Sequence, residues 1–211
     1  TGGPTLIDFD MQRISQRINI ILNIRTEGDI KKEDLLPPII ELSGACGHFN
    51  ISEACLDTTR LYRMVHQAQP DEFTQTGENT YRCVVHFHTL GVIPSAAKGH
   101  LNGPGILQVA LQVSANRLDA SGAPVLDQDG KPVKNSRYIY GAINPYDELT
   151  AAQLIEVRDG KTYLRYSKDD VNIEITSPLV IKADQIVSDD TGMGWQPNDP
   201  TNPDDDIIIE I

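Results

Sequence analysis

Residues 107–114 read Leu-Gln-Val-Ala-Leu-Gln-Val-Ser, with a branched apolar side chain at every second position. Strict alternation of this kind is typical of a β-strand with one buried and one solvated face. Residues 171–176, Val-Asn-Ile-Glu-Ile-Thr, repeat the pattern. Pro104 and Gly105 mark the start of the first of these strands. The second half of the chain is therefore predicted to be rich in β-sheet.

Turn residues divide the neighbouring sequence into further strands. We expect strands at 39–42, 81–90, 137–143, 161–166 and 179–187. The dipeptide Asp129-Gly130 favours a tight turn. Turn formers recur throughout 118–136, where large apolar residues are few. This segment is predicted to be a hairpin that projects from the domain.

Residues 10–24 fit two interpretations. Met11, Ile14, Ile18, Ile21 and Leu22 fall at helical spacing, whereas Ile18, Ile20, Leu22 and Ile24 alternate as in a strand. The pattern favours a helix for the first half and leaves the second half open.

The clearest helix signal runs from Ile51 to Gln69. Asn50 is a suitable N-cap, Glu53 could complete a capping box, and Pro70 would end the helix. One apolar stripe at helical spacing contains Ala54, Thr58, Leu61, Val65 and Ala68. Leu61 and Val65 are therefore expected in the core.

These elements together predict an α+β fold, mostly antiparallel β and sandwich-like or barrel-like. One or two helices are expected in the N-terminal third, within residues 10–69, followed by a β region at 80–187. Residues 1–187 would form a single domain, and 188–211 an acidic, extended C-terminal arm.

Composition limits the partners that we expect. The chain has 18 Lys and Arg against 30 Asp and Glu, a net charge of −12. A negative field of this size repels phosphate backbones, so a nucleic-acid partner is not expected. There is neither an apolar run of the roughly 18–20 residues that a membrane span needs nor a secretion signal. We expect synthesis in the cytoplasm and no membrane partner.

The three cysteines, Cys46, Cys55 and Cys83, are odd in number and lack CxxC spacing. This pattern favours buried thiols over disulfides or a zinc ribbon. Cys46 and Cys55 each have a histidine within about ten residues, yet no catalytic signature surrounds either cysteine. We expect no catalytic residues and no enzyme.

The sequence His86-Phe87-His88 is the sharpest candidate for a metal site, because residues two apart in a strand share a face. Further ligands would come from His48, His66, His100 or a carboxylate, none of which lies at a diagnostic spacing. We expect no metal and no cofactor. An uncharacterised metal-dependent enzyme that uses the histidine pair is kept as an alternative.

Two other segments resemble known sites only in part. The Gly-rich stretch Gly99–Gly105 lacks a phosphate-binding motif and leads into a strand, which predicts a loop. Asp127–Gly130 resembles the start of a calcium loop, but Tyr138 stands where the loop needs Glu. A hairpin turn accounts for this segment.

The last 24 residues differ in kind from the rest. Residues 188–206 are mostly Asp, Pro, Gly, Asn and Thr, which cannot bury enough apolar surface to fold alone. Ile207-Ile208-Ile209-Glu210-Ile211 follows as an apolar strand, expected to pair with its own fold or a neighbour's. The candidate residues for assembly and partner binding are Asp204, Asp205, Asp206, Ile207, Ile208, Ile209 and Ile211.

Two resemblances suggest functions. The turn-rich hairpin at 118–133 and the short strands at 159–163 and 170–176 resemble bacteriophage or contractile-tail structural proteins over about residues 105–187. This resemblance implies a non-enzymatic subunit of a large symmetric assembly, with an exchanged arm. Its partners would be copies of itself and other assembly subunits, and its final location the virion.

The acidic tail is similar to the tails of single-stranded-DNA-binding proteins. This resemblance implies a replication accessory protein that recruits partners through the tail. Bases would stack on Tyr81, Phe87, Tyr138 and Tyr140, beside Arg82, Lys134 and Arg137. The net charge of −12 weighs against this alternative.

Overall fold

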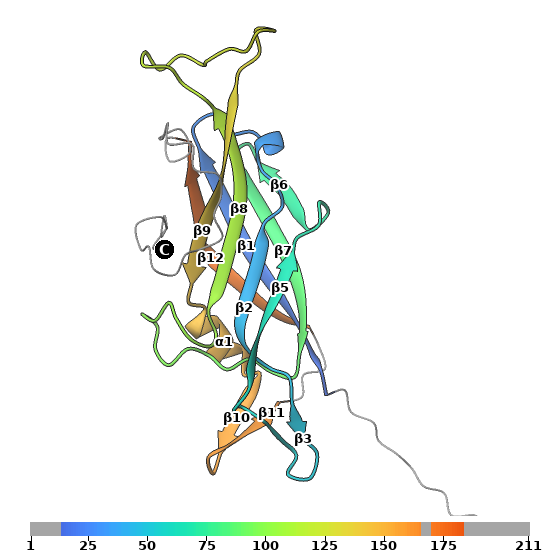
Figure 1. Ribbon diagram of the computed structural model, residues 1–211. Coiled ribbons are helices and arrows are strands. Elements are labelled where there is room, and N and C mark those ends of the chain that lie inside the picture. Colours follow the sequence, from blue (N-terminus) through green and yellow to red (C-terminus); the bar gives the residue numbers. More distant parts are fainter. Residues whose placement is uncertain (1–13, 166–169, 184–211) are drawn as a thin grey trace, which may run out of the picture.

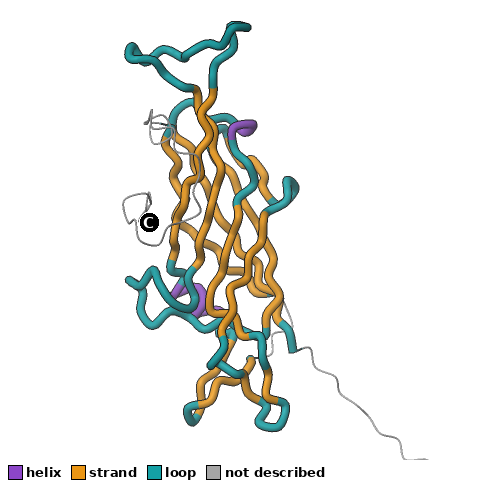
Figure 2. Tube along the Cα trace, in the orientation of Figure 1, coloured by secondary structure: helices purple, strands orange, loops and turns teal. Residues whose placement is uncertain are grey.

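The computed structural model describes residues 14–165 and 170–183, which form an elongated stack of β-sheets (Figure 1). Two four-stranded sheets pack face to face, and a smaller third sheet lies at one end of them (Figures 1 and 2).

The first large sheet has the strand order β12-β1-β7-β6. It contains β1 (Gln16–Glu27), β6 (Phe73–Gly77), β7 (Thr80–Thr89) and β12 (Val171–Lys182). β12 runs parallel to β1, and the other pairs are antiparallel.

The second large sheet is antiparallel throughout, in the order β5-β2-β8-β9. It contains β2 (Ile39–Cys46), β5 (Leu61–Gln67), β8 (Leu107–Asn116) and β9 (Lys134–Ile143). The small sheet contains β3 (Phe49–Asn50), β4 (Cys55–Leu56), β10 (Ile155–Arg158) and β11 (Lys161–Leu164). A 3-10 helix at Lys32–Asp34 and helix α1 (Tyr146–Ala152) complete the described elements.

The alternating apolar residues of the two large sheets meet in one core. Ile18, Ile20, Leu22 and Ile24 of β1, and Leu107, Val109, Leu111 and Val113 of β8, are at most 2% exposed. Each such side chain contributes about 1.5–3 kcal/mol when fully removed from water. The period-two pattern thus identifies the buried face of the sandwich.

The mostly antiparallel sheet architecture is confirmed, and so are the strands expected around 39–42, 81–90, 107–113 and 137–143. The two strands expected around 171–176 and 179–187 are a single strand, β12, as far as the structure describes them. Its pairing with β1 shifts register between Leu22 and Ile24, which accommodates the Ser177-Pro178 interruption.

The helix expected at Ile51–Gln69 is wrong. Asn50 Oδ1 does accept hydrogen bonds from the backbone N–H groups of Ser52 and Glu53, but only a turn follows. Ala54 then adopts a positive φ of 52°, and the chain continues into β4 and β5. Leu61 and Val65 are 37% and 62% exposed, because β5 is an edge strand hydrogen-bonded to β2. Pairing across the sheet outweighs the local helical spacing.

The helix expected in the first half of 10–24 is also wrong where the structure describes it. Residues 14 and 15 are irregular, β1 begins at Gln16, and residues 10–13 lie outside the described residues. The strand interpretation of Ile18–Ile24 is the correct one. Within 14–165 and 170–183 the one α-helix is α1, far from the N-terminal third. Its seven residues carry too short an apolar pattern to be found by periodicity.

Candidate assembly interface

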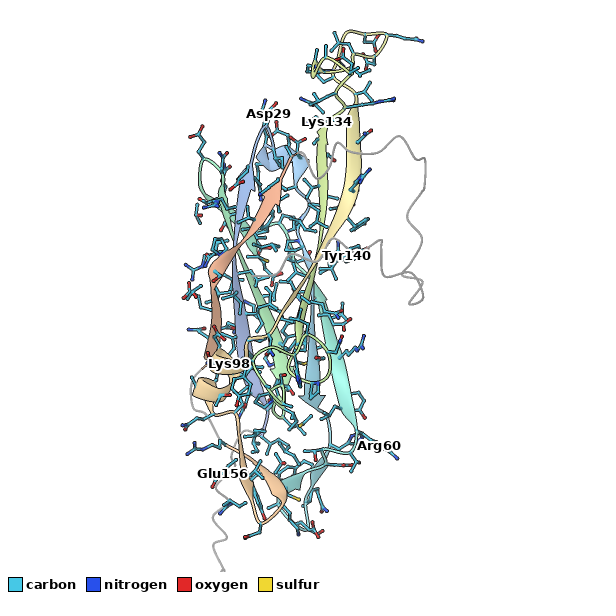
Figure 3. All side chains as sticks on the ribbon, turned by 90° about the vertical axis from the view of Figure 1, so that its left-hand side faces the viewer. Asp29, Arg60, Lys98, Lys134, Tyr140 and Glu156 are labelled. Atoms are coloured by element: carbon cyan, nitrogen blue, oxygen red, sulfur yellow. The ribbon has the colours of Figure 1, made fainter. Side chains whose placement is uncertain are left out.

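The sequence-predicted partner-binding residues, Asp204–Asp206 with Ile207, Ile208, Ile209 and Ile211, lie outside the described residues. The described part of the chain shows the surfaces that could receive them. The first is the flank of the sandwich where edge strands β9 and β12 lie, which faces the viewer in Figure 3.

β9 is an edge strand of one large sheet and β12 is an edge strand of the other. Both edges lie on the same side of the sandwich (Figure 1). Within the described residues, each has a hydrogen-bonded neighbour strand on one side only. The two edges meet where Gly141 faces Leu179: a Cβ added to Gly141 would lie 3.4 Å from Leu179 Cδ1. A sheet edge that has no neighbouring strand favours pairing with another strand.

An open pocket of about 350 Å³ lies at the α1 end of this flank. Its apolar lining includes Leu101, Ile143, Pro145 and Ile175. One wall is fixed by Asn144, whose Nδ2 donates to the carbonyls of Ala97, Lys98 and His100 at 2.7–3.1 Å. The pocket is therefore a preformed recess between the two open edges, of a size that holds small ligands or several side chains.

The charge of β9 differs from that of the whole chain. Its ten residues include Lys134 and Arg137 but no Asp or Glu. Lys134 forms an ion pair with the buried carboxylate of Asp34. Arg137 pairs across the sheet with Val113, whose side chain is fully buried, so Arg137 belongs to the inner face of β9. It has no ion pair within the described residues.

A second candidate surface is the head, residues 117–133, which projects beyond the sheets from the ends of β8 and β9 (Figures 1 and 2). It consists of two successive octapeptides, Leu-Asp-Ala-Ser-Gly-Ala-Pro-Val at 118–125 and Leu-Asp-Gln-Asp-Gly-Lys-Pro-Val at 126–133. Sequence interpretation predicted the hairpin but missed this repeat, although its period of eight is visible in the letters.

The two octapeptides have the same fold. Each has a bridge between its Leu and its Pro, Leu118 with Pro124 and Leu126 with Pro132. Each has a glycine at positive φ, 81° at Gly122 and 75° at Gly130.

A closed ring of backbone hydrogen bonds joins the two loops to the sheet. Val125 N–H donates to Arg117 O, Val133 N–H to Val125 O, and Arg117 N–H to Val133 O, at 2.7–2.8 Å. The head consequently holds its shape by local hydrogen bonds. It exposes Leu118 and Leu126, at 41% and 57%, in equivalent positions.

The structure places the histidine pair on the outer face of the first large sheet. His86 and His88 share the outer face of β7, where Nδ1 of His86 lies 2.7 Å from Oδ1 of Asn19 on β1. Since an amide oxygen only accepts, His86 donates from Nδ1. Asn19 Nδ2 in turn donates to Asn172 Oδ1 at 2.7 Å, which extends the ladder to β12. The described residues contain no group of three or more His, Cys, Asp or Glu placed to hold a metal ion.

The three cysteines are buried and free, as the sequence predicts. Burial raises the pKa of the Cys46 thiol to about 11 and that of the Cys83 thiol to about 12. Burial also raises the pKa of Cys55, with its hydrogen bond to Glu53 adding to the effect. All three are protonated at neutral pH and are poor nucleophiles.

The four aromatic residues proposed to stack bases do not form one platform. Tyr81 and Phe87 are 1% and 5% exposed, because they point into the core. Tyr138 and Tyr140 stack on the outer face of β9 with their ring centroids 6.2 Å apart. Base stacking by Tyr81 and Phe87 is therefore excluded by their burial.

A further open pocket, of about 360 Å³, lies against the small sheet. Its charged side chains are already satisfied: Lys161 pairs with Glu53 at 3.0 Å, and Asp57 accepts hydrogen bonds from Thr59.

No helix among the described residues has the length and hydropathy to cross a membrane. Comparisons with protein-family models, curated proteins and solved structures find no match for this chain.

Proposed function

We propose that this protein is a non-enzymatic structural subunit of a large symmetric assembly, of the kind found in phage virions and tails. Its partners are then copies of itself and other subunits of the assembly. It is synthesised in the cytoplasm and ends in the virion.

The observation that carries the proposal is the pair of edge strands β9 and β12, each of which has a neighbouring strand on one side only within the described residues. Proteins that work as monomers usually cover, shorten or distort such edges, since they template association. Here β12 contains Pro178 and a register shift, which make its edge a poor template for another strand. The ten-residue β9 contains neither Pro nor an acidic residue. The flank supports a role in which another strand completes the sheet.

The sequence of the C-terminal arm also supports a role in which a strand is added to a sheet edge. Ile207–Ile211 offers four aliphatic side chains behind three aspartates. Each aliphatic side chain contributes about 1.5–3 kcal/mol on full burial, while ordering five backbone residues costs about 1–2 kcal/mol each. The balance favours docking only with the backbone hydrogen bonds that strand addition supplies. A neighbouring subunit in a ring or shell provides an edge for this.

The test is the mass in solution of the full-length chain and of a variant lacking Ile207–Ile211. Light scattering at equal concentration is expected to give a defined oligomer for the first and a smaller species for the second. Circular dichroism should show the same strand content in both. Ile51→Ser is the matched control, because Ile51 is 87% exposed on a distant turn and its replacement should leave the mass unchanged. Two monomers would refute the proposal, whereas equal masses with both chains oligomeric would refute only the exchanged arm.

A further inference from the structure

We propose that β5 pairs with β5 of a second copy, antiparallel about a two-fold axis at Met64, so that the second large sheets of two subunits become continuous. This inference rests on the proposed function and names a surface through which copies of the chain meet.

β5 is an exposed edge strand on the flank away from β9 and β12 (Figure 1). None of its seven residues is buried. Leu61, Tyr62 and Val65 are 37%, 44% and 62% exposed. Within the described residues its one neighbouring strand is β2. The strand contains no Pro, no Gly and no acidic residue that would oppose the approach of another strand.

The backbone of β5 presents a symmetric set of groups on its outer side. Ala68 N–H donates to Pro38 O at 2.9 Å, so even-numbered residues point toward β2 and odd-numbered ones away from it. The register shift between β2 and β5 puts its extra residue in β2, so this alternation continues along β5. The residues that point away from β2 are therefore Leu61, Arg63, Val65 and Gln67. These four lie symmetrically about Met64, and an antiparallel copy centred there brings each opposite another.

The side chains of the outer face complement one another in this register. Leu61 lies beside Gln67 of the second copy, and Val65 lies beside Arg63 of the second copy. Long polar side chains cover apolar neighbours with their aliphatic stems and keep their polar ends in water. Each exposed aliphatic side chain of this face thus meets a stem, while the face itself stays in solvent.

Charge complementarity supports the same register. Arg63 Nη1 lies 3.2 Å from Oε1 of Glu41, the β2 residue that pairs with Val65. In the proposed pair, Arg63 of the second copy lies opposite Val65, in the same row across the sheet as Glu41. Each arginine then lies between two glutamates, one from either copy.

Other positions of the axis fit less well. An axis at Arg63 would set two arginines directly opposite each other, which is destabilising. An axis at Val65 would leave Leu61 and Tyr62 beyond the end of the second β5. The axis at Met64 pairs all seven residues, against five in the arm tip Ile207–Ile211. A two-fold contact of this kind uses one surface twice and closes on itself.

Disulfide trapping in the full-length chain tests the axis. Met64 and its copy form a non-hydrogen-bonded pair with Cα atoms about 4.5 Å apart, within the spacing of about 4.4–6.8 Å that a disulfide needs. Oxidation of the Met64→Cys chain is expected to give a disulfide-linked dimer. Val65→Cys is the matched control. Its two copies lie about 7–8 Å apart on the diagonal, so it should link more slowly although Val65 is 62% exposed. The native cysteines are buried, which keeps the background low.

A charge variant uses the same cross-link as its measure. Val65→Lys lies opposite Glu41 within its own chain, so the fold of the subunit is expected to be kept. In the pair it places a like charge beside Arg63 of the second copy, and the linking rate of the Met64→Cys chain should fall by about tenfold or more. Val157→Lys is an equal charge change at a position that is 66% exposed on β10, and should have little effect. Circular dichroism should show unchanged strand content in both.

Each outcome decides a different point. Faster linking of the Val65→Cys chain than of the Met64→Cys chain overturns the register. Linking of the Met64→Cys chain only after removal of Ile207–Ile211 assigns the β5 edge to the arm and overturns pairing between two copies of β5. No link in a chain that light scattering shows to be oligomeric overturns β5 as a contact and leaves the proposed function standing. Monomeric full-length and truncated chains refute the proposed function itself.

Discussion

Asp119 and Asp127 lie eight residues apart and hold two loops of the head in the same geometry. In each loop one carboxylate oxygen accepts hydrogen bonds from the backbone N–H groups two and four residues further on, at 2.8–3.0 Å. Asp side chains stabilise turns in this way without apolar burial. The head therefore owes its order to local polar contacts and not to the sandwich core.

Lowering the pH is expected to destabilise the loop at 118–125, which Asp119 holds. The pKa of Asp119 lies below its ordinary value of 3.8, because the Ser121 hydroxyl and then the backbone N–H groups of Ala123 and Ser121 donate to the carboxylate. With the folded pKa below the unfolded one, the stabilisation is complete above pH 3.8 and is lost as the pH falls through the folded pKa. NMR shifts of the Ser121 and Ala123 amides measure this change. Asp119→Asn should remove the pH dependence, and movement of these amides between pH 5 and 7 would contradict the assignment.

Removing the head is expected to leave the domain folded and to weaken assembly. No residue of 118–132 is buried, and Arg117 and Val133 lie side by side with a backbone hydrogen bond of 2.7 Å. Joining them through Asn-Gly makes a two-residue hairpin turn. Thermal unfolding should stay cooperative, while light scattering shows a lower mass. Leu118→Ser with Leu126→Ser keeps the loops and tests their exposed leucines separately. An unfolded deletion variant would show that the head supports the core.

Two leucines at strand positions are expected to respond very differently to truncation. Leu111→Ala should lower the free energy of unfolding by about 2–5 kcal/mol, because Leu111 is fully buried between the sheets. Leu61→Ala should cost less than about 1 kcal/mol, because Leu61 is 37% exposed on edge strand β5. Urea denaturation of both variants measures the difference. A cost for Leu61→Ala as large as that for Leu111→Ala would mean that β5 is covered in the native state.

The Cys83 thiol is expected to make stability fall at high pH. Burial raises its pKa from 9.0 to about 12, so the folded state keeps a proton that the unfolded state loses. The contribution is fully present below pH 9.0 and is lost as the pH rises from there through about 12. Chemical denaturation between pH 8 and 11 should show a steeper loss for the native sequence than for Cys83→Ala. Equal slopes would show that Cys83 is accessible to solvent.

The strands were predictable where one face is buried along the whole element. In β1 and β8 the inner residues are all apolar at period two, and burial of that face leaves one consistent structure. β5 has no such signal, because its residues are mostly exposed and its backbone is held by β2. A chance helical spacing of Leu61 and Val65 was then the stronger local pattern. Helix α1, at seven residues, is too short to carry a period of its own.

The sequence by itself determined the buried face of the sandwich, the burial of the three thiols and the position of the turn-rich hairpin. These depend on neighbouring residues and on the transfer of apolar side chains from water, which act at short range along the chain. Only the tertiary structure decided that β9 and β12 are the edge strands on one flank and that Arg137 lies on the inner face of β9. It also decided that hydrogen bonds of Asn19 connect His86 to Asn172. Such relationships depend on which strands become neighbours. Local periodicity is the same for an edge strand and a central one, so strand order emerges only when the sheets pack.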